Sequence, residues 1–343
     1  MFDWIDNYIQ AIIILIIMSF IINKAADKLG DALRALAYKL KIPNTVRGAI
    51  FDAASSSFPE FSTAMIAVLI YKDFGNIAIP TIAGSGMFNI LLIPMLSILA
   101  YKGKDRLKAQ KNGIYRDMFF YTASILTLCF FTYMGELTVF AGMILVCIYV
   151  CYIMVLYIET ISYRKKIRGY MFREENDIDD CCQMNHFQII MTIFITSIII
   201  WISCEAIIKC ALVISNIFNI PKFLVSVIIL AACTSIPDTL LSVKSARKGD
   251  VDGAISNAVG SNIFNICMCL GVPIVASGKN LSISLGQSLV TYEFLLVAMV
   301  VTSCIFLKKE GIDKKDGYLM LIVYVIFLVY VTAVAYNLIP MHL

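Results

Sequence analysis

Charged residues are scarce in this chain of 343 residues. Asp, Glu, Lys and Arg make up only 15% of it, whereas apolar residues make up 60%. Soluble globular proteins average about 45–50% apolar and 25% charged residues, so the composition favours a membrane protein over a soluble one. Histidine is rarer still, since only His186 and His342 occur. Neither is placed for a catalytic triad, and the motifs of a paired-aspartate protease are absent. We therefore expect no enzyme and no bound cofactor.

Apolar stretches of roughly 20 residues recur along the whole length, and each can cross a hydrocarbon core of about 30 Å. They lack the alternation of barrel strands, so the sequence predicts an all-α integral membrane protein. The ten predicted transmembrane helices cover about 7–26, 45–71, 76–100, 117–135, 137–160, 188–216, 223–246, 252–277, 284–307 and 317–338.

Cysteines and the N-terminus give no sign of a disulfide framework or a signal peptide. Most of the eleven cysteines lie inside the apolar runs, where small apolar filling is the favoured interpretation, and their spacing suggests no metal cluster. Cys181 and Cys182 lie in a polar loop and are expected to be reduced thiols. Residues 1–6 are acidic rather than basic, so we expect the first helix to be retained.

Basic residues gather in segments that all fall on one side of a ten-span protein. By the positive-inside rule this side is the cytoplasm, and both termini face outward. Each basic segment merely flanks a span, so a nucleic-acid partner is not expected; the expected surroundings are a lipid bilayer, most simply a prokaryotic cytoplasmic membrane. The basic segments are 24–47, 102–116, 164–173, 244–248 and 308–315.

The chain divides into two five-helix halves joined by a polar connector. Residues 1–160 form the first half, 161–186 a cytoplasmic connector and 187–343 the second half. An odd number of spans in each half makes the halves inverted repeats. The acidic run between Glu174 and Asp180 is more often a solvated loop than a regulatory cation site.

The two halves also share sequence motifs. Residues 53–90 and 231–266 each contain a hydroxyl cluster, then proline and a carboxylate, then Gly-Ser-x-x-Phe-Asn-Ile. The repeat motifs extend over 48–95 and 226–272. Inverted repeats with proline-interrupted helices are typical of a transporter whose site lies midway across the membrane.

Two carboxylates carry most of the functional argument. Glu60 and Asp238 lie at equivalent positions inside apolar helices, where a carboxylate costs several kcal/mol and is a functional candidate by default. Each follows a proline, Pro59 or Pro237, which opens the helix because it has no N–H to donate. A cation is one partner for backbone carbonyls freed at that depth.

Other oxygen donors repeat around these carboxylates. The chemistry of this set suits Ca²⁺, which takes six to eight oxygens at about 2.3–2.6 Å, and Na⁺ in smaller pockets, whereas Zn²⁺ prefers nitrogen or sulfur. Two fixed negative charges can balance one Ca²⁺ or two monovalent ions, which favours exchange. The donors are Ser56, Ser57, Thr234 and Ser235 before the carboxylates, and Ser85 and Asn89, with Ser261 and Asn265, at i, i+4 spacing on the following helices.

Other polar residues within the spans leave alternatives open. Asp52 is either an auxiliary proton or cation ligand or the partner of a basic residue on the first helix. Glu205 and Lys209 are spaced i, i+4 and could neutralise each other. Glu293 has no assigned role.

The motifs around Glu60 and Asp238 resemble those of the cation/Ca²⁺ exchanger superfamily. The segment from Thr234 to Asp238, with 245–249 and 259–264, is most similar to the potassium-dependent sodium/calcium exchangers. The resemblance implies a core of helices 2, 3, 7 and 8, with helices 1 and 6 sliding across it during alternating access. It also implies that both carboxylates ligate Ca²⁺ with carbonyls near Ala53 and Ala231. The lining of this site and of the Na⁺ sites would come from Ser56, Ser57, Ser85, Asn89, Thr234, Ser235, Ser261 and Asn265.

Three departures from the family pattern bear on the ions. Asn265 stands where potassium-dependent members have Asp, which puts K⁺ dependence in doubt. Ser55 and Ser56 replace glycines, and Gly86 replaces an Asn. We predict an antiporter that exchanges Ca²⁺ for Na⁺ without a K⁺ requirement. H⁺/Ca²⁺ antiport is the alternative, disfavoured because the Gly-Asn-Ala-x-Glu signature of proton-coupled relatives is missing, and a cation channel is the third interpretation.

Overall fold

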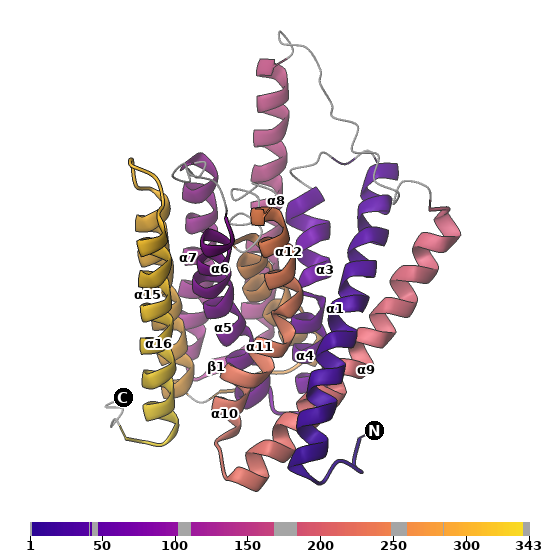
Figure 1. Cartoon of the computed structure of the whole chain (residues 1–343), viewed down its shortest axis with the longest axis vertical. Coiled ribbons are helices and arrows are strands. Elements are labelled where there is room, and N and C mark those ends of the chain that lie inside the picture. Colours follow the sequence, from indigo (N-terminus) through magenta and orange to yellow (C-terminus); the bar gives the residue numbers. More distant parts are fainter. Residues whose placement is uncertain are drawn as a thin grey trace.

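The computed structural model describes residues 2–40, 42, 47–101, 111–167, 184–247, 259–283 and 285–338. The part of the chain so described is nearly all helical, and Figure 1 shows its long helices running side by side. Most of the predicted connector 161–186 lies outside the described residues, together with Cys181, Cys182 and the acidic run. Also outside the described residues are 102–110, which belong to a predicted basic segment, and 248–258, where the eighth span was predicted to begin.

The first half contains one long helix, two interrupted helices and two further helices. Short π-helical segments, labelled η, interrupt the second and third. The elements are α1 (Tyr8–Lys39), η1 (Gly48–Asp52), α3 (Ala53–Ser56), α4 (Phe58–Ile66), η2 (Ala67–Tyr71), η3 (Phe74–Ala78), α5 (Ile79–Met87), η4 (Phe88–Leu92), α6 (Ile93–Ala100), α7 (Lys111–Tyr133), β1 (Glu136–Leu137) and α8 (Val139–Ile167).

The second half repeats this pattern, with π-helical segments again in its second and third helices. Its elements are α9 (His186–Phe218), α10 (Lys222–Val225), η6 (Ser226–Leu230), α11 (Ala231–Thr234), α12 (Ile236–Arg247), η7 (Asn265–Leu270), α14 (Gly271–Ser277), β2 (Leu281–Ser282), α15 (Leu285–Phe306) and α16 (Lys314–Ala335). A helical turn from Val259 leads directly into η7.

Seven helices of the described part are long and apolar enough to cross a membrane, or eight when a bent pair counts as one span. The chain is therefore a multi-pass membrane protein. The bent pair is Ile50–Ser56 with Phe58–Tyr71, and its two parts meet at 56°. A further apolar helix, Lys222–Thr234, is shorter because the chain breaks at Ser235. The count of ten spans and their inverted arrangement stay predictions.

The first helix is longer than the predicted span 7–26, which was wrong at its end. α1 runs to Lys39 because its buried apolar face continues past the first charges, through Ala26 and Leu29 to Ala35. At its start the Asn7 side chain accepts a hydrogen bond from the Ile9 amide, which is the usual way to cap a helix N-terminus. α1 packs chiefly along α9, and the pair lies at one side of the molecule (Figure 1).

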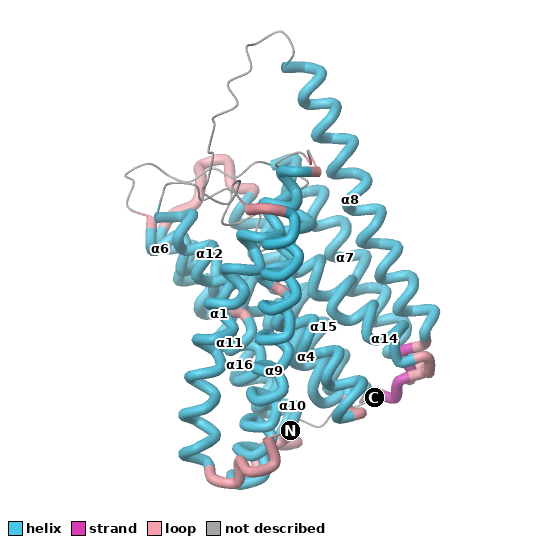
Figure 2. The backbone as a smooth tube through the Cα atoms, turned by 90° about the vertical axis from the view of Figure 1, so that its right-hand side faces the viewer, coloured by secondary structure: helices cyan, strands magenta, loops and turns pink. Residues whose placement is uncertain are grey.

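Two short strands join segments that are far apart in the sequence. β1 pairs antiparallel with β2, so that Glu136 lies opposite Ser282 and Leu137 opposite Leu281. The turn after α7 and the turn after α14 therefore meet at one end of the bundle (Figure 2). The N-terminus and the end of α16 lie toward this same end in Figure 1. The shared end fits the predicted topology, although the side of the membrane that it faces stays a prediction.

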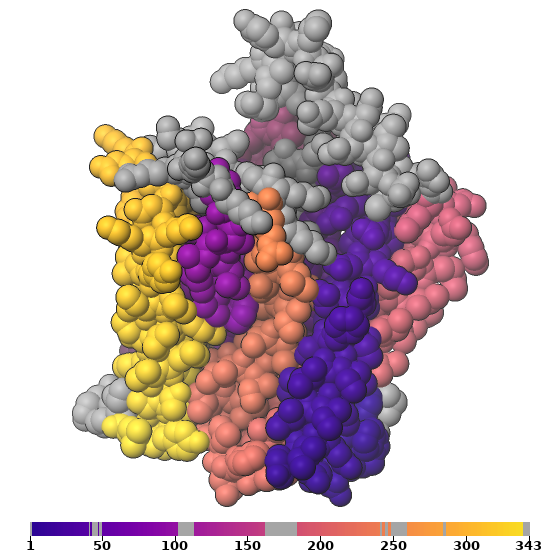
Figure 3. Space-filling model, in the orientation of Figure 1, coloured from indigo at the N-terminus to yellow at the C-terminus, as the bar shows by residue number. Residues whose placement is uncertain are grey.

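The interior is closed on the face shown in Figure 3, where α1 and the segment from α10 to α12 lie side by side. Behind this face, the apolar core is continuous across both halves. The interrupted helices contribute most of the buried polar side chains in it. This arrangement places the two repeat motifs against each other at the centre of the bundle.

Candidate cation site between the two halves

Each repeat contains one break in its second helix, directly before the carboxylate. Ser57 ends α3 with φ −95° and ψ 9°, and Ser235 ends α11 with φ −84° and ψ 1°. Proline follows two residues later in both, at the second position of the next helix, where its missing N–H costs no helical hydrogen bond. Glu60 and Asp238 therefore lie in the first turn of α4 and α12. There the amide dipoles of the helix favour negative charge.

Glu60 is fully buried and receives hydrogen bonds from both halves of the chain. The Ser85 hydroxyl donates to Glu60 Oε1 at 3.1 Å, and the Ser235 hydroxyl donates to the same oxygen at 3.3 Å. The two hydroxyl oxygens lie 2.8 Å apart. The Asn265 side chain extends this cluster, because its Nδ2 donates to Ser85 Oγ at 3.3 Å.

Asp238 is surrounded in a corresponding way. It is fully buried, Ser261 Oγ donates to its Oδ1 at 3.3 Å, and Asn89 Nδ2 donates to its Oδ2 at 3.1 Å. Ser261 and Ser85 occupy equivalent repeat positions, and each contacts the carboxylate of its own half. Each carboxylate also has one donor from the opposite half. The predicted pair of repeats is thus brought together around one buried polar cluster.

Two further predicted ligands, Ser56 and Thr234, donate hydrogen bonds to backbone carbonyls of their own helices. Ser56 Oγ donates to the Asp52 carbonyl at 3.0 Å, and Thr234 Oγ1 donates to the Ala231 carbonyl at 3.2 Å. The Ala53 and Ala231 carbonyls also accept the amides at the two breaks, each at 3.0 Å. These groups lie on the helix turns beside the cluster but are already occupied by helical hydrogen bonds. Their binding of a cation stays a prediction.

Three buried oxygens of this cluster have no hydrogen-bond partner among the described residues. They are Ser57 Oγ, Glu60 Oε2 and Asn89 Oδ1. A buried oxygen without a partner costs about 1–3 kcal/mol, and more when it is charged. These three differ from other such oxygens of the described residues in lying beside the two buried carboxylates, so they are the candidate positions for a ligand. All three are hard donors that suit Ca²⁺ or Na⁺.

Positive side chains do not compensate the carboxylates. Among the described residues, no hydrogen bond or ion pair joins a Lys, Arg or His to Glu60 or Asp238. The same part of the chain holds no group of three or more His, Cys, Asp or Glu that could bind a metal. The chemistry of the cluster is therefore two carboxylates with hydroxyl and carboxamide neighbours, as expected for an alkali or alkaline-earth cation and not for Zn²⁺.

The sequence did not indicate several neighbours of the site. Asn262 is fully buried, and its Nδ2 donates to the Gly86 carbonyl at 3.0 Å and contacts the Tyr121 hydroxyl at 3.4 Å. Gly86 and Asn262 are equivalent repeat positions, and a Cβ at Gly86 would lie 2.9 Å from Leu295 Cδ2 and 3.4 Å from the Tyr121 hydroxyl, so a side chain is disfavoured there. Two thiols, of Cys204 and Cys269, also contact carbonyls at the first break. Thiols in apolar helices give no sequence signal that separates such contacts from filling.

The other polar residues of the spans lie away from the carboxylates. Arg34 Nε, on α1, donates to Asp52 Oδ1 at 2.8 Å, so the pairing interpretation of Asp52 is confirmed. Lys209 Nζ lies 2.7 Å from Asp3 Oδ1, a contact that lowers the pKa of Asp3. Glu293 is exposed on α15. None of these contacts reaches the central cluster.

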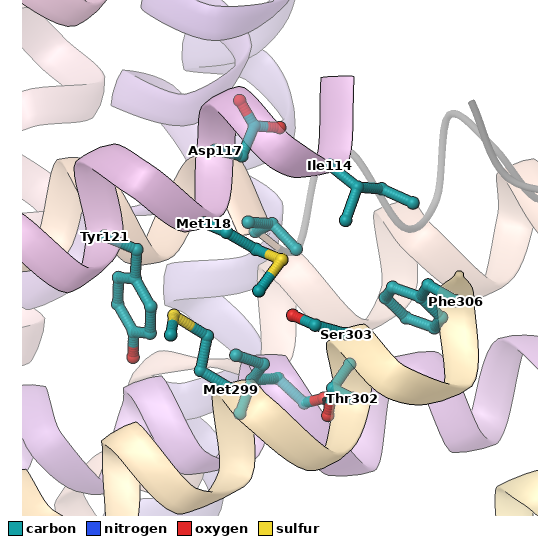
Figure 4. A pocket seen from close by; sticks show the side chains of 10 residues that line it. Ile114, Asp117, Met118, Tyr121, Met299, Thr302, Ser303 and Phe306 are labelled. Carbon is teal, nitrogen blue, oxygen red and sulfur yellow. Dashed lines mark hydrogen bonds between the residues drawn. The ribbon is translucent and has the colours of Figure 1, made fainter. Parts of the chain in front are cut away.

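A separate cavity of about 30 Å³ lies between α7, α15 and the helix that begins at Val259. Figure 4 shows the Met118 and Met299 side chains pointing toward each other across it, with the Tyr121 ring beside them. Its lining is mostly apolar. The Tyr121 hydroxyl, which contacts Asn262, is its closest link to the cation site. This volume is about that of one water molecule and does not form part of the carboxylate cluster.

Comparison with protein families gives one match that spans both halves. A model described as "Sodium/calcium exchanger protein" matches residues 10–158 and 188–333. The human "Sodium/potassium/calcium exchanger 4" is 34% identical over 170 residues, which cover 47% of this chain and 27% of that protein. The chain thus spans about a quarter of the length of this relative. The "Inner membrane protein YrbG" of Escherichia coli (strain K12) is 24% identical over 261 residues, covering 76% of this chain and 78% of that one.

Solved structures of exchangers share the fold. The "H+/Ca2+ Exchanger CAX" aligns with a TM-score of 0.74 at 14% identity, over 96% of this chain and 86% of that one. The "sodium-calcium exchanger NCX_Mj", soaked with Na⁺ and Sr²⁺, aligns with a TM-score of 0.62 at 19% identity, over 94% of this chain and 99% of that one. At these identities the likeness concerns the arrangement of helices and not the ions.

Proposed function

Because this chain belongs to the sodium/calcium exchanger protein family, we propose that it is a secondary antiporter that exchanges Ca²⁺ for Na⁺ at the site around Glu60 and Asp238. The observation that carries the proposal is the cluster that joins the two carboxylates to donors of both halves. Asn89 contacts Asp238 and Ser235 contacts Glu60, so a cation bound there is held by both repeats at once.

The two-segment match supports the inverted architecture. Residues 10–158 and 188–333 correspond to the proposed halves 1–160 and 187–343. Ten spans in this arrangement would place the termini outside the cell membrane and the connector 161–186 in the cytoplasm. The pairing of β1 with β2 fits this plan, since both turns would then lie on the outer side.

The charge of the site sets which ions can exchange. Two carboxylates balance the charge of one Ca²⁺ or two Na⁺, so Ca²⁺ and Na⁺ compete for the same oxygens. Potassium is not required in this proposal, because Asn265 is neutral and the described site holds no third carboxylate. The unpaired oxygens of Ser57, Glu60 and Asn89 supply the first ligands. Carbonyls at the first break, which the thiols of Cys204 and Cys269 contact at 3.5 and 3.7 Å, add others when a cation displaces those weak contacts.

Alternating access would use the helix pair α1 and α9. α1 packs mainly on α9, and this pair contacts the core through α3, α4 and α12. Cys204 of α9 contacts the Pro59 carbonyl, next to Glu60, at 3.5 Å. A shift of the pair relative to α4 would therefore change access directly beside the carboxylate.

The test is a flux assay with purified protein in liposomes. Vesicles loaded with Na⁺ should take up ⁴⁵Ca²⁺ when diluted into Na⁺-free medium, and they should not when Na⁺ is equal on both sides. Glu60→Gln should abolish this uptake, while Glu293→Gln, which removes an exposed carboxylate, should leave it intact. Uptake that ignores the Na⁺ gradient but follows a pH gradient would replace the proposal with H⁺/Ca²⁺ antiport. Flux without any counter-ion would indicate a channel.

A further inference from the structure

The two asparagines of the site are oriented differently. Asn89 and Asn265 occupy equivalent repeat positions, and both are fully buried. Asn89 gives its Nδ2 to Asp238, and its Oδ1 has no partner. Asn265 gives its Nδ2 to Ser85, but its Oδ1 accepts a hydrogen bond from the Cys269 thiol at 3.5 Å. The first asparagine thus offers an oxygen to a cation, and the second does not.

A cysteine one turn further along the helix causes the difference. Cys269 lies four residues after Asn265 on η7, fully buried, and its sulfur also lies 3.7 Å from the Ser57 carbonyl. The residue at the corresponding place after Asn89 is Ile93, which has no polar hydrogen. The Cys269 thiol donates its hydrogen to the amide oxygen, while Ser85 Oγ accepts from the amide nitrogen. The two contacts together hold one of the two orientations of the Asn265 carboxamide, and turning it over would lose the hydrogen bond from Cys269.

That orientation directs hydrogens toward the carboxylate cluster. Asn265 Nδ2 donates to Ser85 Oγ, and Ser85 donates on to Glu60 Oε1. The partial positive charge of the NH₂ group occupies the side of Glu60 where a cation would otherwise find an oxygen ligand. Turning the carboxamide over would place Oδ1 beside Ser85 and add one hard donor to the site.

We propose that Cys269 is a positioning residue that keeps the Asn265 amide oxygen out of the cation site. Na⁺ binding on that side of the site is weakened as a result. This role rests on the proposed exchange function. The ligand set is then unequal between the two halves. Monovalent ions bind next to Asn89 more tightly than next to Asn265. The limit on Na⁺ affinity is thereby assigned to one thiol that follows the shared Gly-Ser-x-x-Phe-Asn-Ile sequence.

The decisive variants remove or retain the donor. Cys269→Val has similar volume and no hydrogen to donate, whereas Cys269→Ser keeps a donor. In Cys269→Val the half-saturating Na⁺ concentration for Ca²⁺ exchange should fall about fivefold, the effect of one hydrogen-bond-sized contact. Its maximal rate should change less than this affinity does. Cys269→Ser should retain the Na⁺ affinity of the unmodified protein.

A second thiol provides the matched control. Cys267 is also buried on η7, but it contacts Ser124 at 3.0 Å and not the site. Cys267→Val should leave the Na⁺ dependence unchanged. The inference is overturned if Cys269→Val shows the original Na⁺ affinity, if Cys269→Ser behaves like Cys269→Val, or if Cys267→Val lowers the half-saturating concentration equally.

A reciprocal variant keeps the test independent of how well Cys269→Val folds. Ile93→Cys places a thiol after Asn89 at the spacing of Cys269, and it should weaken Na⁺ binding by occupying Asn89 Oδ1; unchanged binding would contradict the inference. Binding of ²²Na⁺ to purified protein should follow the same order as the fluxes. If the unmodified protein shows no Na⁺-driven uptake, the exchange function fails, and ²²Na⁺ binding alone then decides the role of Cys269. If uptake is Na⁺-driven but no variant alters its Na⁺ dependence, only this inference fails.

Discussion

Asn89 donates a hydrogen bond to Asp238 at 3.1 Å, across 149 positions of sequence. The amide and the carboxylate come from opposite halves of the chain, and both are fully buried. The amide nitrogen holds one carboxylate oxygen in place, while the amide oxygen stays without a partner. One side chain thus orients a buried carboxylate and leaves its own amide oxygen available to a cation.

Removal of this side chain should weaken Ca²⁺ binding more than it weakens the fold. In Asn89→Ala the half-saturating Ca²⁺ concentration should rise about tenfold, because a hydrogen bond to a charged group is worth about 1.5–3 kcal/mol. The measurement is ⁴⁵Ca²⁺ uptake at varied Ca²⁺ with a fixed Na⁺ gradient. Ser97→Ala removes a buried hydroxyl of α6 that has no partner among the described residues, and it should change little. Equal effects of both variants would contradict a role for Asn89 as a ligand.

Gly84 permits the closest approach of the two halves. A Cβ at this position would meet the Val227 carbonyl oxygen and lie 2.7 Å from Ala231 Cβ. We expect Gly84→Ala to destabilise the protein by roughly 2 kcal/mol or more, because backbone atoms would have to move. The measurement is thermal unfolding in detergent.

The equivalent glycine of the second repeat is the control for Gly84. Among the described residues, the nearest neighbour of a Cβ at Gly260 is the Tyr152 hydroxyl at 4.0 Å, so Gly260→Ala should be tolerated. Similar melting temperatures for the two variants would show that the close approach of α5 to η6 and α11 does not determine the stability of the protein.

Asp52 should contribute to stability and not to ion coupling. It pairs with Arg34 at 2.8 Å, with side chains that are 20% and 29% exposed. Asp52→Asn should reduce the free energy of unfolding by about 1 kcal/mol. Adding Arg34→Gln also removes the contact of Arg34 with Asp31 at 3.5 Å, so the double variant should be less stable than Asp52→Asn. Ca²⁺ uptake at several pH values is the second measurement. A changed pH dependence in Asp52→Asn would revive its interpretation as a proton ligand.

A charge at position 265 should change the monovalent cation requirement. Asn265→Asp replaces the amide that donates to Ser85 with a carboxylate, which would be the third carboxylate beside Glu60 and Asp238. The added negative charge needs an additional cation, so exchange should gain sensitivity to K⁺ or require more Na⁺ per Ca²⁺. Uptake in K⁺ medium compared with choline medium measures this change. Identical ion dependence before and after the substitution would exclude position 265 from cation coupling.

The buried polar cluster was largely predictable from the sequence because its signals are chemical. Glu60 and Asp238 are carboxylates in apolar helices, each after a proline, and their duplication indicated that they belong together. Ser85, Asn89 and Ser261 were found by their spacing in the repeated motif. The structure brings these residues into one cluster, although cation binding there is still a prediction.

Features that depend on packing were not readable in this way. The end of α1 was misplaced because charges begin at Lys24, whereas the buried face of Ala26 and Leu29 continues the helix. The contact of the Asn265 amide oxygen with Cys269 was not predictable, because Cys269 has no distinctive sequence signal. The glycine at position 86 has an explanation only once Leu295 and Tyr121 are seen to pack against it.

Hydroxyls and amides surround Glu60 and Asp238, and within the described residues no cationic side chain bonds to either. In the proposed antiporter an unloaded site would seal two bare anions in a dry pocket, which costs several kcal/mol for each ion. Such a carrier would stay open to one compartment until a cation or proton arrives. This electrostatic cost alone would then prevent the empty site from reorienting to the other side of the membrane. Uncoupled dissipation of the ion gradient would therefore be suppressed without a separate gating element.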